Sequence, residues 1–173
     1  MKNTSLTLDL NTGRCQWGES AGQPFRLLVS GDICPIRNTA TRMLAGESGA
    51  ILADIAGMLA DKDLSIVNLE APMTERPAPI LKIGPNLIVS PRSVELLRAG
   101  GWDIACCANN HIGDHGPAAM LQTLRLLAEN GIASVGAGRN LDEARQPLFI
   151  ERNGTRVAVL ALAEHEFGTA TPS

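Results

Sequence analysis

The chain has 173 residues, a length that suits one well-packed domain and is short for two. Hydrophobic residues make up 45% and charged residues 19% of it, which is typical of a globular protein in water. The net charge of -3 and the 3% content of aromatic residues, none of them Tyr, argue against a nucleic-acid-binding surface. The composition therefore predicts a single domain with an aliphatic core and no nucleic-acid partner.

The N-terminal segment and the cysteines bear on the compartment. No window approaches the roughly 20 apolar residues of a membrane span, and the N-terminus lacks the long apolar segment of a signal peptide. We therefore expect a cytoplasmic protein, membrane-associated only if a targeting segment has been removed. The four cysteines show no Cys-x-x-Cys spacing, and the neighbours Cys106 and Cys107 would point to opposite faces of a strand. They are expected to be small buried side chains rather than disulfides or metal ligands.

Residues 1–24 are predicted to form a peripheral strand or hairpin, because leucines alternate there before an Asn-Thr-Gly turn. The main domain is expected over 25–173. Its first strand is predicted over 25–30, and Asp32 follows that strand directly after a glycine. Such a carboxylate lies where the backbone turns tightly, so it could bind a ligand or simply cap the turn or the next helix.

A second carboxylate closes the next predicted strand. Apolar residues recur at helical spacing over 39–60, with glycines at 46–49 that could interrupt them, which predicts a crossover helix leading to a parallel strand. That strand is predicted over 64–70 and ends at Glu70. Glu70 is either a residue of the rim or a ligand that points into a site, and we give these two interpretations equal weight.

The proline-rich segment 75–91 has no helical periodicity and is too long for a simple connection, so we predict a binding loop there. Short strands are predicted within it at 80–83 and 86–89. Lys82 could contact an anionic substrate, although a solvated lysine is the expectation.

The remainder of the chain alternates helices and strands. The predicted elements are a helix over 94–99 with Ser93 as its N-cap, a buried strand over 102–108, a helix over 120–130, a strand over 132–135, a helical turn at 141–145, and a hairpin of strands 148–151 and 157–162 around Asn153-Gly154. Between the buried strand and the next helix lies the segment Asn109–Gly116, which is rich in Asn, His and Gly. Because sites in open α/β sheets gather at the carboxyl ends of strands, the chemistry is expected first in this segment.

The polar residues that follow predicted core strands form one constellation. They are Asp32, Glu70, Asn110, His111, Asp114 and His115. If the strands are parallel, these residues converge on one edge of the sheet, where carboxylate, amide and imidazole donors suit Mn, Fe or Zn. Two such metals could clamp a phosphate and supply a nucleophile near neutral pH, while Asn110 could be a neutral ligand and His111 could deliver a proton.

Each of these residues also has a simpler interpretation. Asp32, Glu70 and Asn110 could be ordinary turn or cap residues, and His111 could be a hydrogen-bonded loop histidine. Asp114 is expected to orient a neighbouring side chain rather than to bind metal directly. His115 is expected to be a loop or rim residue.

Taken together and in this order, four motifs resemble the CapA family. They are Gly31-Asp32, Asn68-Leu69-Glu70, Asn109–Gly116, and Gly136-Ala137-Gly138-Arg139-Asn140 with Glu143-Ala144. The resemblance covers roughly residues 26–168. This family is the capsule and poly-γ-glutamate synthesis group of the calcineurin-like metallophosphoesterases. The resemblance implies an α/β fold, a four-layered α/β/β/α sandwich that is expected to be incomplete at its C-terminus in this chain.

The resemblance also implies a site that holds one or two divalent ions, Mn, Fe or Zn. Asp32, Glu70 and Asn110 match metal-ligand positions of the family. His111 matches the catalytic histidine, and Asp114 matches the acidic residue that orients it. The substrate implied by this site is phosphate-containing.

Histidines beyond the hairpin complete the dimetal site in the family, whereas this chain offers only His165 there. The chain is therefore expected to be the N-terminal portion of a longer protein or a shortened relative. The resemblance implies a metal-dependent phosphoesterase of capsule or poly-γ-glutamate biosynthesis, in which metal-activated water attacks a phosphate ester. The alternatives are a non-catalytic accessory component that binds a polyanionic polymer or a partner protein, and a fragment whose open sheet edge pairs with a second copy as a homodimer.

Overall fold

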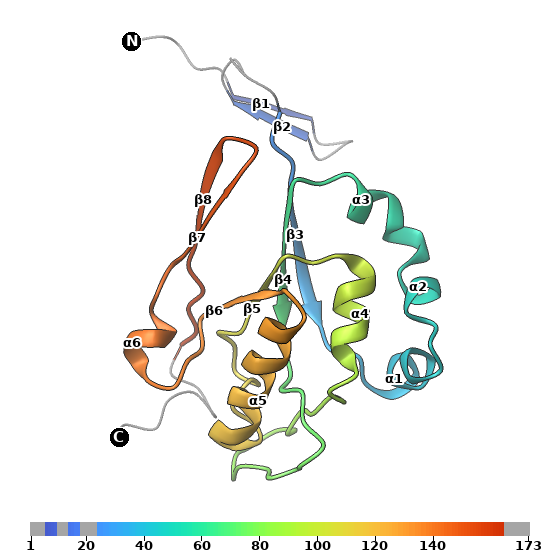
Figure 1. Cartoon of the computed structure of the whole chain (residues 1–173), viewed down its shortest axis with the longest axis vertical. Coiled ribbons are helices and arrows are strands. Elements are labelled where there is room, and N and C mark those ends of the chain that lie inside the picture. The colour runs from blue at the N-terminus through green and yellow to red at the C-terminus, as the bar shows by residue number, and fades with distance from the viewer. Residues whose placement is uncertain (1–5, 10–13, 18–23, 165–173) are drawn as a thin grey trace.

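The structure, a computed structural model, describes residues 6–9, 14–17 and 24–164. Its strands are β1 (Leu6–Asp9), β2 (Arg14–Trp17), β3 (Leu27–Ile33), β4 (Leu64–Leu69), β5 (Ile104–Cys106), β6 (Ala133–Val135), β7 (Leu148–Arg152) and β8 (Thr155–Val159). Its helices are α1 (Arg37–Leu44), α2 (Ser48–Ile51), the 3-10 helix η1 (Ala53–Ile55), α3 (Ala56–Ala60), α4 (Ser93–Gly100), α5 (Gly116–Glu129) and α6 (Leu141–Ala144). Two antiparallel hairpins, β1–β2 and β7–β8, accompany a four-stranded central sheet (Figure 1).

The central sheet has the strand order β3-β4-β5-β6, and all four strands run parallel. Parallel neighbours need a crossover segment, and helices provide it after each of the first three strands. The pairing shifts register between Val29 and Asp32, which places Asp32 opposite Asn68 near the end of β4. A bulge of this kind re-aims a side chain, and here it brings the carboxylate of β3 to the carboxyl edge of the sheet.

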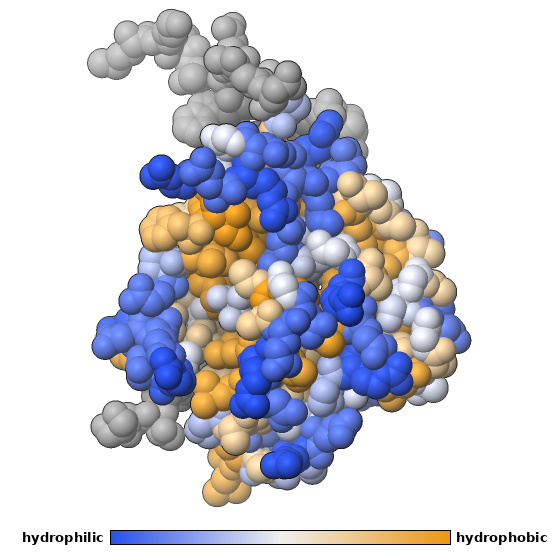
Figure 2. Space-filling model, in the orientation of Figure 1, coloured by the Kyte–Doolittle hydropathy of each residue, from blue (hydrophilic) through white to orange (hydrophobic). Residues whose placement is uncertain are grey.

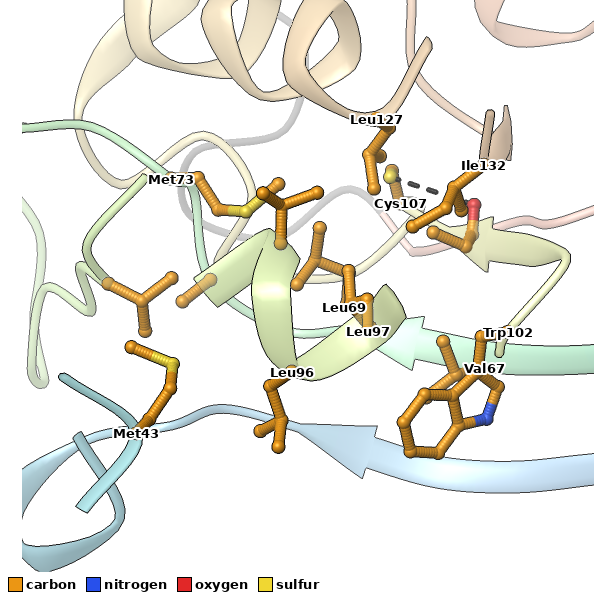
Figure 3. Close-up of a cluster of buried hydrophobic side chains, with 14 of the residues drawn as sticks. Met43, Val67, Leu69, Met73, Leu96, Leu97, Trp102, Cys107, Leu127 and Ile132 are labelled. Carbon is orange, nitrogen blue, oxygen red and sulfur yellow. Dashed lines mark hydrogen bonds between the residues drawn. The ribbon is translucent and has the colours of Figure 1, made fainter. Parts of the chain in front are cut away.

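One face of the sheet is covered by α1, α3, α4 and α5. The buried cluster on this face joins Met43 of α1, Leu97 of α4 and Leu127 of α5 to Val67 and Leu69 of β4 (Figure 3). Burial of such side chains stabilises the fold by ~1.5–3 kcal/mol each, so this aliphatic cluster holds the helices on the sheet. None of the described helices combines the length and the apolar character that crossing a bilayer requires.

The opposite face of the sheet is covered by the β7–β8 hairpin. A second buried cluster joins Ile104 and Val135 of the sheet to Val159 of β8. The hairpin does not cover Val29 on β3, which is 65% exposed, and Phe149 of the hairpin is exposed to the same extent. Figure 2 shows apolar surface beside the hairpin. The helices α1 to α5, the four-stranded sheet and the β7–β8 hairpin thus form three layers.

The α/β class, the four parallel strands and the closing hairpin agree with the sequence-based predictions and are confirmed. Cys107 lies in the buried cluster under the helices, and the half-buried Cys106 packs against the cluster on the opposite side of the sheet, as strand alternation predicts. The helix predicted over 39–60 is divided into α1, α2, η1 and α3, and Gly46 adopts a φ of 85° after the end of α1. The predicted N-terminal hairpin pairs as β1–β2, and its turn lies outside the described residues.

The prediction that Ser93 caps α4 is wrong. The helix begins at Ser93 itself, Arg92 occupies the N-cap position, and no side chain caps the helix. The backbone N–H of Ser93 donates a 2.8 Å hydrogen bond to the carbonyl of Ser90, so a tight turn precedes the helix and takes over the role of a cap.

The strands predicted at 80–83 and 86–89 do not form in the described structure, where 75–90 is an irregular segment. Two backbone N–H groups of this segment donate hydrogen bonds to Asp114 instead of to a neighbouring strand. The N–H of Ile80 bonds to the carbonyl of Asp114, and the N–H of Leu87 bonds to the carboxylate of the same residue. Because these donors bind one residue of a distant loop, they cannot take part in a strand ladder.

Gly136, directly after β6, allows close packing at the edge of the sheet. Its φ is +91°, and a Cβ there would lie 2.6 Å from the Cβ of Ala108 and 2.9 Å from that of Ala161. We therefore expect Gly136→Ala to lower the free energy of unfolding, measured by urea denaturation, by about 1–3 kcal/mol. Gly154→Ala is the matched control, because Gly154 has a φ of +74° and a Cβ there would meet no other atom within 4 Å. Equal losses in the two variants would contradict the packing argument.

Candidate functional site

Three strand ends meet at the carboxyl edge of the central sheet. Asp32 lies near the end of β3, Glu70 directly follows β4, and His111 lies in the loop after β5. Asn68 Nδ2 donates a hydrogen bond to Asp32 Oδ1 (2.7 Å), and Asn109 Nδ2 donates one to Asn68 Oδ1 (3.2 Å). This series of side-chain hydrogen bonds ties the three strand ends together.

Asn109 folds the loop that carries the histidine. Its Oδ1 accepts hydrogen bonds from the backbone N–H groups of His111 (3.1 Å) and Ile112 (2.9 Å), which is the pattern of an Asx turn. Its Nδ2 also donates to the carbonyl of Leu69 (2.9 Å). The side chain of the neighbouring Asn110 makes none of these hydrogen bonds, and Asn110 is exposed at the edge of the sheet.

His111 is held through one of its two ring nitrogens. Its Nδ1 lies 2.7 Å from Asp114 Oδ2. Since an ionised carboxylate can only accept, Nδ1 carries the proton of this hydrogen bond. Nε2 lies 4.0 Å from Glu70 Oε1, toward the strand ends. Nε2 is therefore the nitrogen placed to exchange a proton with a molecule bound at the edge.

Asp114 is completely buried, and Lys82 neutralises it. The side chain of Lys82 is 3% exposed, and its Nζ pairs with Asp114 Oδ1. The backbone N–H of Leu87 donates to Asp114 Oδ2 (2.6 Å). The expectation of a solvated Lys82 is therefore wrong. A buried carboxylate requires a compensating cation, and Lys82 supplies it.

His115 lies in the predicted loop, but it is not a rim residue. It is 5% exposed, and its Nδ1 accepts a 2.9 Å hydrogen bond from the backbone N–H of Ala78. His115 therefore anchors the start of the 75–90 segment, as Asp114 anchors its middle. The rim prediction is wrong because this segment, distant in sequence, folds over the histidine.

Cys34 was expected only to be a small buried side chain, but it is a neighbour of the site. Burial, with a further contribution from the nearby carboxylates of Glu70 and Asp32, raises the pKa of its thiol to about 11. Cys34 is therefore a neutral thiol near physiological pH, close to both carboxylates. Its spacing of two residues from Asp32 is the sequence signal that could have indicated this position.

A sequence profile of one protein family, described as bacterial capsule synthesis protein PGA_cap, matches residues 26–173. The chain belongs to this PGA_cap family. The match includes every described element from β3 onward, so it contains the whole carboxyl edge and the residues that meet there.

Curated relatives of this PGA_cap chain include two proteins named CapA. The capsule biosynthesis protein CapA of Bacillus anthracis is 28% identical over 79 residues, which are 46% of this chain and 19% of that protein. The PGA biosynthesis protein CapA of Bacillus subtilis is 30% identical over 80 residues, 46% of this chain and 21% of the relative. The uncharacterized protein y4sH of Sinorhizobium fredii is 29% identical over 144 residues, 80% of this chain and 30% of the relative. The matched part of this chain thus spans less than a third of the length of these relatives.

The donors at the edge of this PGA_cap chain fit a divalent metal by their chemistry. Asp32 and Glu70 offer carboxylates and Asn110 an amide oxygen, which are donors that suit a divalent ion such as Mn, while the ring of His111 beside them is placed for proton exchange. Among the described residues, neither carboxylate pairs with a Lys or Arg, so the edge carries negative charge that a cation would balance. In the part of the chain that the structure describes, no three His, Cys, Asp or Glu side chains are grouped so that they could hold a metal ion. A metal at this edge would therefore also need the amide of Asn110.

Proposed function

We propose that this chain carries the metal-dependent phosphoesterase site of a protein that serves capsule or poly-γ-glutamate biosynthesis. The observation that supports the proposal most is the meeting of Asp32, Glu70 and the His111–Asp114 pair at one edge of a parallel sheet. The names of two relatives, capsule biosynthesis protein CapA and PGA biosynthesis protein CapA, support the biosynthetic context. The substrate would be a phosphate ester.

Asp32, Glu70 and Asn110 would hold one or two divalent ions. When bound, such an ion supplies positive charge against phosphate oxygens and lowers the pKa of a coordinated water. The surrounding side chains prepare the carboxylates for this role. The amide of Asn68 orients Asp32 through Oδ1, and the neutral thiol of Cys34 lies near both carboxylates.

His111 would move the proton that the reaction requires. Asp114 holds the ring through Nδ1, so Nε2 is directed toward Glu70 and the strand ends. A proton on Nε2 can pass to the leaving oxygen of the ester, which is general acid catalysis. The leaving group then departs as a neutral alcohol rather than as an alkoxide.

Metal content and hydrolysis test the proposal together. The purified protein, supplied with Mn²⁺, is expected to bind metal near stoichiometrically and to hydrolyse bis(p-nitrophenyl) phosphate. Asp32→Asn and Glu70→Gln are expected to lose the metal, measured by mass spectrometry, together with the activity, because each removes a negative donor. Asp54→Asn on η1 and Glu129→Gln on α5 alter exposed carboxylates outside the edge and should retain both properties.

Three outcomes would count against the proposal. Wild-type protein that stays folded and metal-free in Mn²⁺ would overturn it, and metal retained by Asp32→Asn and Glu70→Gln would mean that the ion binds elsewhere. Metal that both variants lose, without hydrolysis of any phosphate ester by the wild type, would favour a binding role toward a polyanionic polymer.

A further inference from the structure

The irregular segment 75–90 is organised around one residue of the histidine loop. Figure 1 shows this segment, in green, below the end of β4 and beside α5. Three of its groups bind Asp114, which are the backbone N–H of Ile80, the ammonium of Lys82 and the backbone N–H of Leu87. Within the described structure its strand-like pairing is limited to an isolated bridge between Met73 and Val89 at its ends. The segment therefore takes its shape from Asp114 rather than from a sheet.

Lys82 and His111 share the carboxylate of Asp114 by binding different oxygens. Lys82 pairs with Oδ1, and His111 Nδ1 lies 2.7 Å from Oδ2. Lys82 Nζ is also 3.3 Å from His111 Nδ1. Because Nδ1 already carries the proton directed at Asp114, it cannot accept from Lys82, so the ammonium and the ring interact through the carboxylate.

We propose that Lys82 is a positioning residue for His111. By occupying Oδ1, Lys82 fixes the rotation of the Asp114 carboxylate, so that Oδ2 holds the Nδ1–H of His111 and Nε2 faces Glu70. Within the described residues, Lys82 is the one Lys or Arg in contact with Asp114. The catalytic consequence rests on the proposed function, whereas the orientation of the ring does not.

The competing explanation is that Lys82 only neutralises a buried charge. That role predicts a loss of stability when Lys82 is replaced, with the ring of His111 unchanged in the protein that remains folded. A positioning role predicts a change at the ring itself. The protonation site of the ring, seen by NMR of ¹⁵N-labelled protein, separates the two because it does not depend on stability or on activity.

The test compares wild type with Lys82→Met, a neutral side chain of similar length. In the wild type we expect a downfield Nδ1–H proton resonance, assigned to His111 by its absence in His111→Ala. In Lys82→Met we expect that resonance to shift or disappear. We also expect kcat toward a phosphate ester to fall roughly 10–100-fold, the usual effect of removing a partner that orients a ligand or catalytic group, with KM unchanged. Lys62→Met is the matched control, since Lys62 is also partly buried but bonds to the carbonyls of Leu59 and Gly100.

Variants that restore the charge keep the test decisive if Lys82→Met does not fold. Lys82→Arg retains a cation, and Lys82→Ala leaves room for added propylammonium, which replaces the missing part of the side chain. Lys82→Arg, and Lys82→Ala with propylammonium, are each expected to recover the His111 resonance at least in part. Circular dichroism checks that each variant is folded.

Several results would overturn the proposal. One is a His111 ring that carries a proton at Nε2 but none at Nδ1 in the wild type, and another is a resonance that folded Lys82→Met leaves unchanged. A raised KM with unchanged kcat would make Lys82 a substrate contact instead. If the wild type hydrolyses no ester, the proposed function fails, while the NMR comparison still decides the role of Lys82.

Discussion

Asp114→Ala is expected to lower the free energy of unfolding by about 3–5 kcal/mol, the usual cost of removing one partner of a buried ion pair. The variant would leave the ammonium of Lys82 without its partner in a site where that side chain is 3% exposed. It would also remove the acceptor for the backbone N–H of Leu87 and for Nδ1 of His111. Urea denaturation followed by far-UV circular dichroism measures the loss.

Two comparisons isolate the buried charge in this experiment. Asp54→Ala removes an exposed carboxylate on η1 and is expected to change the free energy of unfolding by no more than about 0.5 kcal/mol. The double variant Lys82→Met/Asp114→Ala removes both charges, and its loss is expected to be smaller than the sum of the two single losses. Additive losses would show that the two charges do not stabilise each other and would contradict this account.

His111→Ala is expected to lower kcat of the metal-loaded protein about 10²–10⁴-fold, the usual contribution of a positioned general acid. The metal content should be unchanged, because Asp32 and Glu70 remain in place. KM should change little, because the proton transfer belongs to the transition state rather than to binding. Steady-state kinetics in Mn²⁺, with metal content measured on the same samples, check the three expectations together.

The leaving group provides an internal control for the role of His111. A p-nitrophenolate ion leaves without being protonated, whereas a simple alkoxide needs a proton. The loss in His111→Ala should therefore be larger for an alkyl phosphate ester than for a p-nitrophenyl ester. Equal losses for both substrates would assign His111 to binding of metal or phosphate rather than to proton delivery.

The sheet could be predicted from the sequence because burial follows strand geometry. Four of the six residues of β4 are apolar, as expected for a parallel strand covered on both faces, and the strand ends directly before Glu70. Asn68, which bonds to Asp32, carries a weaker signal, because it is a single amide in an apolar strand. Its role depends on the register between β3 and β4, which includes a bulge that the sequence does not reveal.

The loop 75–90 could not be predicted in the same way. Apolar residues at 80–83 and 86–89 are typical of strands, but Leu81 and Ile83 are almost fully exposed, and Lys82 between them is buried. Alternation correctly indicates that these residues point to opposite sides. It does not indicate which side is the interior, and here a charged side chain is turned inward because its partner is there.

By itself the sequence determined the α/β class, the parallel strands, and the positions of Asp32, Glu70 and His111 at or beyond the strand ends. These features are local, since hydrophobic periodicity and turn residues are read within a few positions of one another. Only the tertiary structure decided which atom satisfies each buried polar group. Lys82 and Asp114 are 32 residues apart, and the charge of one is compensated by the other because burial brings them together. An irregular loop has no period from which such a contact can be read, so the partner of a buried charge is set by proximity in space.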